Sequence, residues 1–121
     1  MDRVCAAIKD STAGGLLCRR FSFLYPDGPA PYYSIMAKSN HDNALEAYQY
    51  ISNAASDALM DVGATITHHH AVGKSFRPWY DKEVDPLYRK ALAAVKGELD
   101  PNWIMNPGLL IDRPKPLKIV G

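Results

Sequence analysis

In residues 16–25 aromatic side chains alternate with other side chains, and a turn follows. This pattern constrains the fold of the chain most strongly. Alternation with a period of two is typical of a β-strand. The aromatic residues of the stretch share one face of such a strand: Phe21, Phe23 and Tyr25. Turn-forming residues follow at 26–29, and a second β-rich segment follows at 32–37. The sequence therefore predicts an antiparallel hairpin, with a connection longer than two residues.

The chain then changes to the period of a helix. In residues 44–61 apolar side chains recur at three- and four-residue steps, so that they form one stripe. Asn43 is placed to cap the start of this helix, and Gly63 is placed to end it. The β-branched residues at 64–67 predict a third, short strand after the helix.

Further helices are expected before the hairpin and in the last third of the chain. Residues 2–9 suit a short helix, and residues 78–80 suit a helical turn in which Trp79 is a packing anchor. Asp85-Pro86 is a helix-starting pair, and it precedes a second amphipathic stripe in residues 87–99.

Together these elements predict an α+β fold, a small antiparallel sheet covered by helices, in one domain over residues 1–121. Apolar residues make up 47% of the chain and charged residues 22%, which argues against intrinsic disorder. The net charge of +1 gives no electrostatic case for binding nucleic acid or an anionic membrane. The chain has no apolar run long enough for a bilayer, no signal-like start and only two cysteines, so the cytoplasm is the expected location.

Three consecutive histidines, His68, His69 and His70, are the most unusual local feature. At the end of a strand, His68 and His70 would point together and His69 would point away. These imidazoles could act as acids or bases or bind substrate, could form two legs of a metal site, or could belong to a solvated loop. No acidic residue or cysteine lies near enough in the sequence to complete a metal site, so no metal is predicted.

Gly73-Lys74 follows the histidines, but the upstream glycine of a phosphate-binding loop is missing because position 68 is a histidine. No Gly-x-Gly pattern occurs in the chain, so it carries no recognisable nucleotide-binding loop. Lys74 and Arg77 could neutralise a substrate anion, and they could equally be a solvated surface pair.

Tyr32 and Tyr33 are adjacent in the second predicted strand, so one should face the core and the other should face away. Taken alone, a tyrosine in such a place is more often a packing residue than a catalytic one. The residues by themselves therefore leave the role of Tyr32 open.

Short motifs follow one another along the chain. They are Tyr25-Pro26-Asp27-Gly28, Tyr32, His68-His69-His70-Ala71-Val72-Gly73-Lys74, Arg77-Pro78-Trp79, Lys96 before Asp100-Pro101-Asn102, and Asn106-Pro107-Gly108-Leu109-Leu110. This series resembles the C-terminal cap or substrate domain of FAD-linked oxidases of the vanillyl-alcohol oxidase superfamily. Within that superfamily it is most similar to the alkylglycerone-phosphate (alkyl-dihydroxyacetone-phosphate) synthases. The histidines carry this distinction, because related glycolate and D-lactate dehydrogenases have a Glu-His-Gly type sequence at the place of His69-His70-Ala71.

The resemblance implies a flavoprotein of ether-lipid synthesis. Synthases of this kind exchange the acyl chain of an acyl-dihydroxyacetone phosphate for an alkyl chain, with FAD and without net redox change. By this similarity the catalytic residues are Tyr32, His68, His69 and His70. The implied substrate-binding residues are Lys74 and Arg77. The implied cofactor-binding residues are His69, His70 and Asn106.

The resemblance also implies a partner, because the FAD-binding domain of the family is absent from these 121 residues. FAD would be held mainly by another domain or subunit, so we expect the isolated chain to be catalytically inactive. The motif at Asn106-Pro107-Gly108 also resembles the dehydrogenase branch, which keeps open an FAD-linked 2-hydroxy-acid (D-lactate or glycolate) dehydrogenase or oxidase. A non-catalytic binding or assembly module is a third alternative, and a homodimer stays open.

Overall fold

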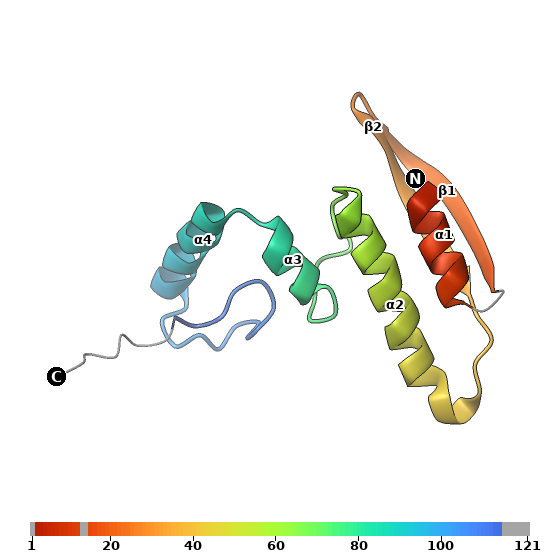
Figure 1. Ribbon diagram of the computed structural model, residues 1–121. Helices are drawn as coiled ribbons and strands as arrows, with labels where there is room; N and C mark the ends of the chain where they lie inside the picture. The colour runs from red at the N-terminus through yellow and green to blue at the C-terminus, as the bar shows by residue number, and fades with distance from the viewer. Residues whose placement is uncertain (1, 13–14, 115–121) are drawn as a thin grey trace. The chain divides into compact units, whose positions relative to one another are not determined.

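The computed structural model describes residues 2–12 and 15–114, which form two compact units divided between His68 and His69. The elements, in order, are α1 (Asp2–Ser11), β1 (Leu16–Tyr25), β2 (Gly28–Met36), the 3₁₀ helix η1 (His41–Asn43), α2 (Ala44–Asp61), α3 (Arg77–Glu83) and α4 (Pro86–Leu99) (Figure 1). The α+β class is confirmed, and no composition shift or linker marks the boundary between the two units in the sequence.

The predicted hairpin is present, but its connection is shorter than the sequence indicates. β1 pairs with β2 in antiparallel fashion, and Tyr25 is the register partner of Gly28, so only Pro26-Asp27 lies between the strands. Gly28 has φ +141°, a conformation that side-chain-bearing residues rarely adopt. The glycine therefore lets β2 begin directly after the turn, four residues earlier than residue 32, and the prediction of a longer connection is wrong.

A β-bulge in the hairpin overturns the predicted face of one aromatic residue. Phe21 is the partner of Pro31 and Phe23 is the partner of Ala30, so Ser22 is one extra residue in β1. Because successive residues of β2 point to opposite faces, Phe21 and Phe23 lie on opposite faces of the hairpin. The expectation that these aromatic residues share one face is therefore wrong for Phe21.

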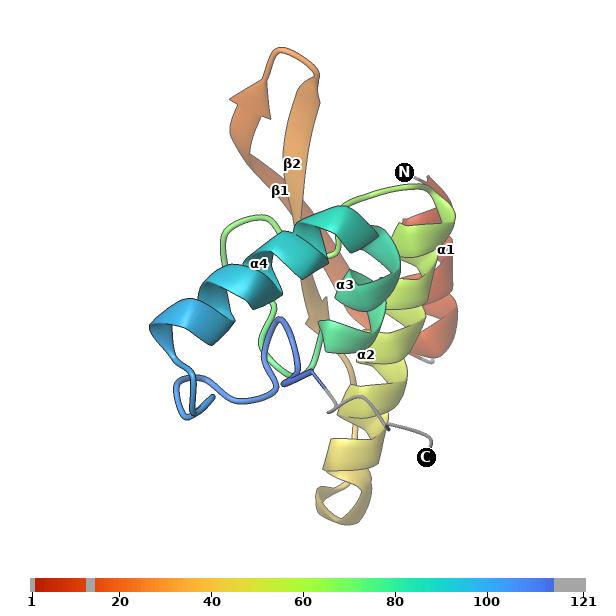
Figure 2. The same ribbon diagram turned by 90° about the vertical axis from the view of Figure 1, so that its left-hand side faces the viewer.

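The core of the first unit lies between α1, α2 and one face of the hairpin. Val4 and Ile8 of α1 are each 1% exposed and cluster with Ala58 of α2. Partly buried residues surround them: Ala7, Leu17, Tyr33, Ile35, Ala55 and Leu59. α1 contacts both β1 and α2, which run alongside it (Figures 1 and 2). Tyr33 thus faces the core, and its neighbour in the strand faces away, as predicted.

α2 has the predicted bounds, and its C-terminus ends in the predicted way. The N–H of Gly63 donates to the carbonyl of Met60 at 2.9 Å, and the N–H of Ala64 donates to the carbonyl of Leu59 at 3.0 Å. With Gly63 at φ +70°, this is a Schellman motif, in which glycine takes the left-handed position at no steric cost.

Two local predictions around α2 are wrong. Asn43 makes no side-chain cap, because η1 precedes the helix and the Asn43 Oδ1 accepts from the backbone N–H of Asn40 at 2.9 Å. Residues 64–67 form no strand, and in the part of the chain that the structure describes the sheet has only two strands. β-branched residues favour a strand where a neighbouring strand can pair with them.

Gly15 is required where the chain passes close to the end of β2. A Cβ at Gly15 would lie 2.5 Å from the carbonyl oxygen of Met36 and 2.9 Å from the Cβ of Thr12, which is 5% exposed. We expect Gly15→Ala to lower the free energy of unfolding by about 1–3 kcal/mol, the usual cost of overpacking. Urea unfolding followed by far-UV circular dichroism measures it.

Gly97→Ala is the matched control for this substitution. Gly97 lies in α4, a Cβ there would meet nothing within 4 Å, and alanine is the better helix former. The control should be neutral or stabilising by up to about 1 kcal/mol. Equal losses in the two variants would contradict the close approach at Gly15.

The second unit contains α3 and α4. Asp85 caps α4 as predicted, because its Oδ1 accepts from the N–H groups of Leu87 at 2.7 Å and Tyr88 at 3.2 Å. Trp79 is 7% exposed, which confirms its packing role.

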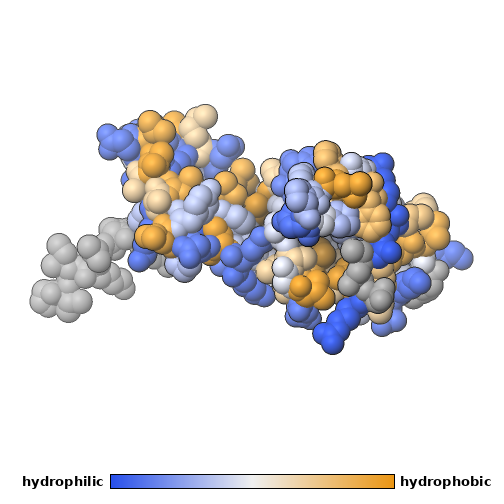
Figure 3. Space-filling view, turned by 90° about the horizontal axis from the view of Figure 1, so that it is seen from above, coloured by the Kyte–Doolittle hydropathy of each residue, from blue (hydrophilic) through white to orange (hydrophobic). Residues whose placement is uncertain are grey.

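The apolar stripe of α4 is exposed, with Leu99 at 80%. Figure 3 shows apolar residues at the surface of both parts of the chain. None of the helices that the structure describes has the length and apolarity of a membrane span.

Candidate functional site

The face of the hairpin that points away from α1, here called the open face, carries an aromatic cluster. The guanidinium carbon of Arg20 lies 5.0 Å from the ring centre of Tyr32, and the rings of Tyr32 and Phe23 are 6.3 Å apart. The His68 ring lies 5.4 Å from that of Phe23. The structure therefore brings two predicted site residues, Tyr32 and His68, to the same cluster, and the bulge at Ser22 places Phe23 between them.

The phenol that contacts a histidine is that of Tyr25. Its hydroxyl lies 2.8 Å from Nε2 of His68, and the two rings meet edge to face with centroids 5.5 Å apart. Both residues are exposed. The sequence analysis did not include Tyr25 among the site residues. The one signal for it in the sequence is its place as the first residue of the Tyr-Pro-Asp-Gly motif.

His69 and His70 begin the second unit and pack against each other. Their rings meet edge to face with centroids 4.6 Å apart, and both side chains are exposed. Adjacent residues of a strand would point in opposite directions. The predicted alternation of the three histidines is therefore wrong, because residues 68–70 form bends and Ala71 has φ +66°.

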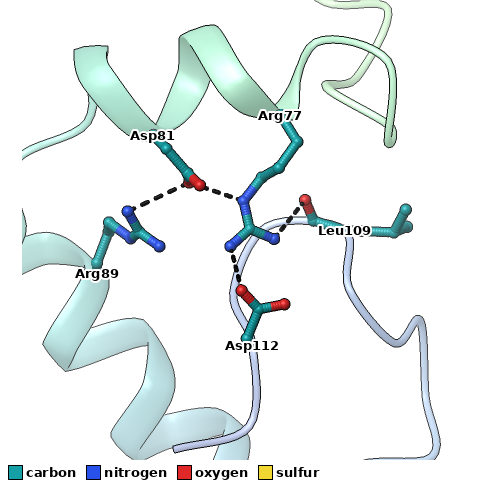
Figure 4. A network of polar contacts seen from close by, with 5 residues as sticks. All are labelled: Arg77, Asp81, Arg89, Leu109 and Asp112. Carbon is teal, nitrogen blue, oxygen red and sulfur yellow. Dashed lines mark hydrogen bonds and ion pairs between the residues drawn. The ribbon is translucent and has the colours of Figure 1, made fainter.

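Arg77 is the centre of a polar network that joins α3, α4 and the segment after α4 (Figure 4). Its Nε and Nη2 pair with Asp81 at 2.7 Å and Asp112 at 2.9 Å, and its Nη1 donates to the carbonyl of Leu109 at 3.1 Å. Arg89 also pairs with Asp81, at 3.2 Å. Burial lowers the pKa of Arg77, but the bonds and charges of Asp81 and Asp112 outweigh it and raise the pKa. The guanidinium is thus held by two carboxylates, whereas Lys74 is exposed.

We expect Arg77→Ala to lower the free energy of unfolding of the second unit by about 2 kcal/mol. The Arg77 side chain is 11% exposed, and hydrogen bonds to charged groups contribute about 1.5–3 kcal/mol each, less where the partner is exposed. Both tryptophans lie in this unit, so urea unfolding followed by tryptophan fluorescence reports on it. Lys74→Ala is the control and should stay within about 0.5 kcal/mol of the wild type. A wild-type midpoint in Arg77→Ala would exclude a stabilising role.

The turn before Asn106 is organised by Asp100. Its carboxylate accepts from the N–H groups of Ile104 at 3.1 Å and Met105 at 3.0 Å, and it pairs with Lys96. The hydrogen bond from Lys96, together with those from Met105 and Ile104, lowers the pKa of Asp100. Lys96 also donates to the carbonyl of Met105 at 2.6 Å. These two motif residues therefore build the loop that presents Asn106, which is exposed at φ +45°.

Metal ligands were one alternative for the histidines. Within residues 2–12 and 15–114, no three or more His, Cys, Asp or Glu side chains come together as a metal site.

Comparison with known proteins identifies relatives of the chain. The family model described as FAD linked oxidases, C-terminal domain, matches residues 1–110, which span both units. An alkyldihydroxyacetonephosphate synthase from Dictyostelium discoideum is 26% identical over 103 residues, 85% of this chain and 17% of that protein. The enzyme of the same name from Caenorhabditis elegans is 40% identical over 70 residues, 58% of this chain and 12% of that protein. No solved structure matches the chain.

A third relative, the alkyldihydroxyacetonephosphate synthase of Trypanosoma brucei brucei, is 27% identical over 90 residues, 74% of this chain and 15% of that protein. The chain therefore spans only 12–17% of the length of these three relatives. The resemblance read from the motifs is confirmed by these matches.

Proposed function

Because this chain belongs to the family of FAD linked oxidases, C-terminal domain, we propose that it is the substrate-domain segment of an FAD-dependent enzyme similar to the alkyldihydroxyacetonephosphate synthases. The proposed reaction exchanges the acyl chain of an acyl-dihydroxyacetone phosphate for an alkyl chain, which makes the ether bond of ether lipids. The structural observation that supports the proposal is that Tyr32 and His68 belong to one cluster on the open face of the hairpin.

The residues of this chain fit a flavin site in the chemistry that they offer. Phenols and imidazoles, which donate and accept hydrogen bonds, are exposed or half-buried rather than closed in the core. We propose that His69, His70 and Asn106 contact the cofactor, and that a domain or subunit outside this chain holds most of it. FAD supplies a conjugated ring system that accepts and returns electrons. The isolated chain is then expected to be inactive.

The proposed chemistry asks the side chains of this chain to move protons. An α-proton must leave the substrate, a carboxylate must depart and an alcohol must lose its proton, so groups that exchange protons near neutral pH are needed. We assign the acid or base role to Tyr32 and proton transfer to His68, His69 and His70, since imidazole changes charge in this range. Anion recognition falls to Lys74, because Arg77 would have to give up carboxylate partners to bind substrate.

The test is to add two kinds of substrate to the complete FAD-bearing protein. We expect acyl-dihydroxyacetone phosphate to bleach the flavin absorbance, and labelled fatty alcohol to enter the product. A flavin that ignores this substrate but is reduced by D-lactate or glycolate would instead establish the 2-hydroxy-acid dehydrogenase, which the Asn106-Pro107-Gly108 motif favours. Indifference to all three compounds would leave the non-catalytic assembly module.

A further inference from the structure

His68 has no regular secondary structure to hold its side chain. The segment from 64 to 70 contains no strand or helix, so the position of this imidazole depends on what its ring touches. Two residues of β1 supply three of those contacts: the ring of Phe23, and the ring and the hydroxyl of Tyr25. The Tyr25 hydroxyl, 2.8 Å from Nε2, is at hydrogen-bond distance.

The bulge at Ser22 is what makes this contact with Tyr25 available. Tyr25 is the partner of Gly28, which lies on the same face of β2 as Tyr32, four residues later. Without the extra residue in β1, Tyr25 would lie opposite the residue before Gly28. Its side chain would then point to the face of Tyr33. Bulges commonly re-aim side chains next to functional sites.

We propose that Tyr25 is a positioning residue that holds the His68 imidazole against the open face and fixes its tautomer. A neutral imidazole carries one N–H donor and one acceptor nitrogen, so a partner at one nitrogen decides the state of the other. A phenol is a better proton donor than a neutral imidazole N–H. The Tyr25 O–H therefore donates to Nε2, and Nδ1 carries the proton.

The structural half of this inference is tested on the 121-residue chain without cofactor or substrate. In the wild type, long-range ¹H–¹⁵N spectra at neutral pH should show His68 protonated at Nδ1, and an NOE should join its Hε1 to the ring protons of Tyr25. Tyr25→Phe should move the His68 ring nitrogens toward the shifts of exposed His41. Tyr48→Phe, a change at a residue that is 62% exposed on α2, should leave them unchanged.

Two results would overturn the proposal. One is a wild-type His68 without the Tyr25 NOE and with the tautomer mixture of His41, an observation that needs no variant. The other is a His68 tautomer that does not respond to Tyr25→Phe.

The catalytic half rests on the proposed function and is tested in the complete FAD-bearing enzyme. Tyr25→Phe should lower kcat by about 10- to 100-fold, as expected when an orienting partner is removed, with KM and the flavin spectrum unchanged. A higher KM at unchanged kcat would overturn the positioning role. If the enzyme ignores acyl-dihydroxyacetone phosphate while the spectra show the Tyr25–His68 pair, the proposed function fails and the pairing stands.

Discussion

In the complete FAD-bearing enzyme, Tyr32→Phe should lower turnover by about 10²–10⁴-fold, the range typical of a lost acid or base group. The substitution removes only the hydroxyl. The phenylalanine ring can keep the contacts that Tyr32 makes with Phe23, at 6.3 Å, and with Arg20, at 5.0 Å. FAD content and fold should therefore stay as in the wild type. Steady-state kinetics and the flavin absorbance spectrum of the purified variant measure the effect.

The neighbouring tyrosine is the matched control for this experiment. Tyr33 belongs to the same strand but packs at the core, where burial and nearby Cys5 raise its pKa against the opposing effect of Arg19. Tyr33→Phe should therefore lower stability slightly and leave turnover within about twofold of the wild type. Undiminished activity in Tyr32→Phe would remove Tyr32 from the mechanism.

His69→Ala and His70→Ala should each slow turnover by about 10²–10⁴-fold, if these groups transfer protons in the reaction. Both side chains are exposed, so their loss leaves no cavity and the fold should persist. The measurement is kcat and KM over a range of pH, because loss of an acid or base group removes one limb of the profile.

His41→Ala is the control, since His41 is an exposed histidine of η1 in the first unit. It should have wild-type kinetics. Wild-type rates in both His69→Ala and His70→Ala would return the three histidines to the solvated-loop interpretation.

The places of the helices and of the hairpin could be predicted from the sequence because each depends on local chemistry. The apolar period gave α2 its bounds, Asp85-Pro86 started α4, and Gly63 ended α2 in a Schellman motif. The opposite faces of Tyr32 and Tyr33 also follow locally, since neighbouring side chains of a strand alternate.

Two of the errors have a different cause, which is that pairing between segments decides them. The extra residue Ser22 changes which face Phe23 and Tyr25 occupy, and the alternation within β1 alone does not show it. The residues at 64–67 have strand-like composition but no strand pairs with them in the described part of the chain.

The candidate site shows the same division. The motifs pointed to Tyr32 and the histidines as candidate site residues. The contact of Tyr25 with His68 joins residues 43 positions apart, and the motifs did not predict it. Arg77 has the charge of an anion-binding residue. Its pair with Asp81 has the local i,i+4 spacing of a helix, but only the fold shows that Asp112 also pairs with it. No local pattern encodes the contacts of Arg77 with Asp112 and of Tyr25 with His68, because they arise where separate elements come together.

The sequence by itself determined the places of the helices and the hairpin, the α+β class, the family and the candidate proton-handling residues. Those properties follow from periodicity, caps and motifs that span a few residues each. Tertiary structure alone decided the face on which each aromatic residue lies, the partner of His68 and the role of Arg77 in joining α3 to the segment after α4. Strand register and side-chain contact depend on a balance of free energies across the whole chain, and a one-residue change of register reverses every face beyond it.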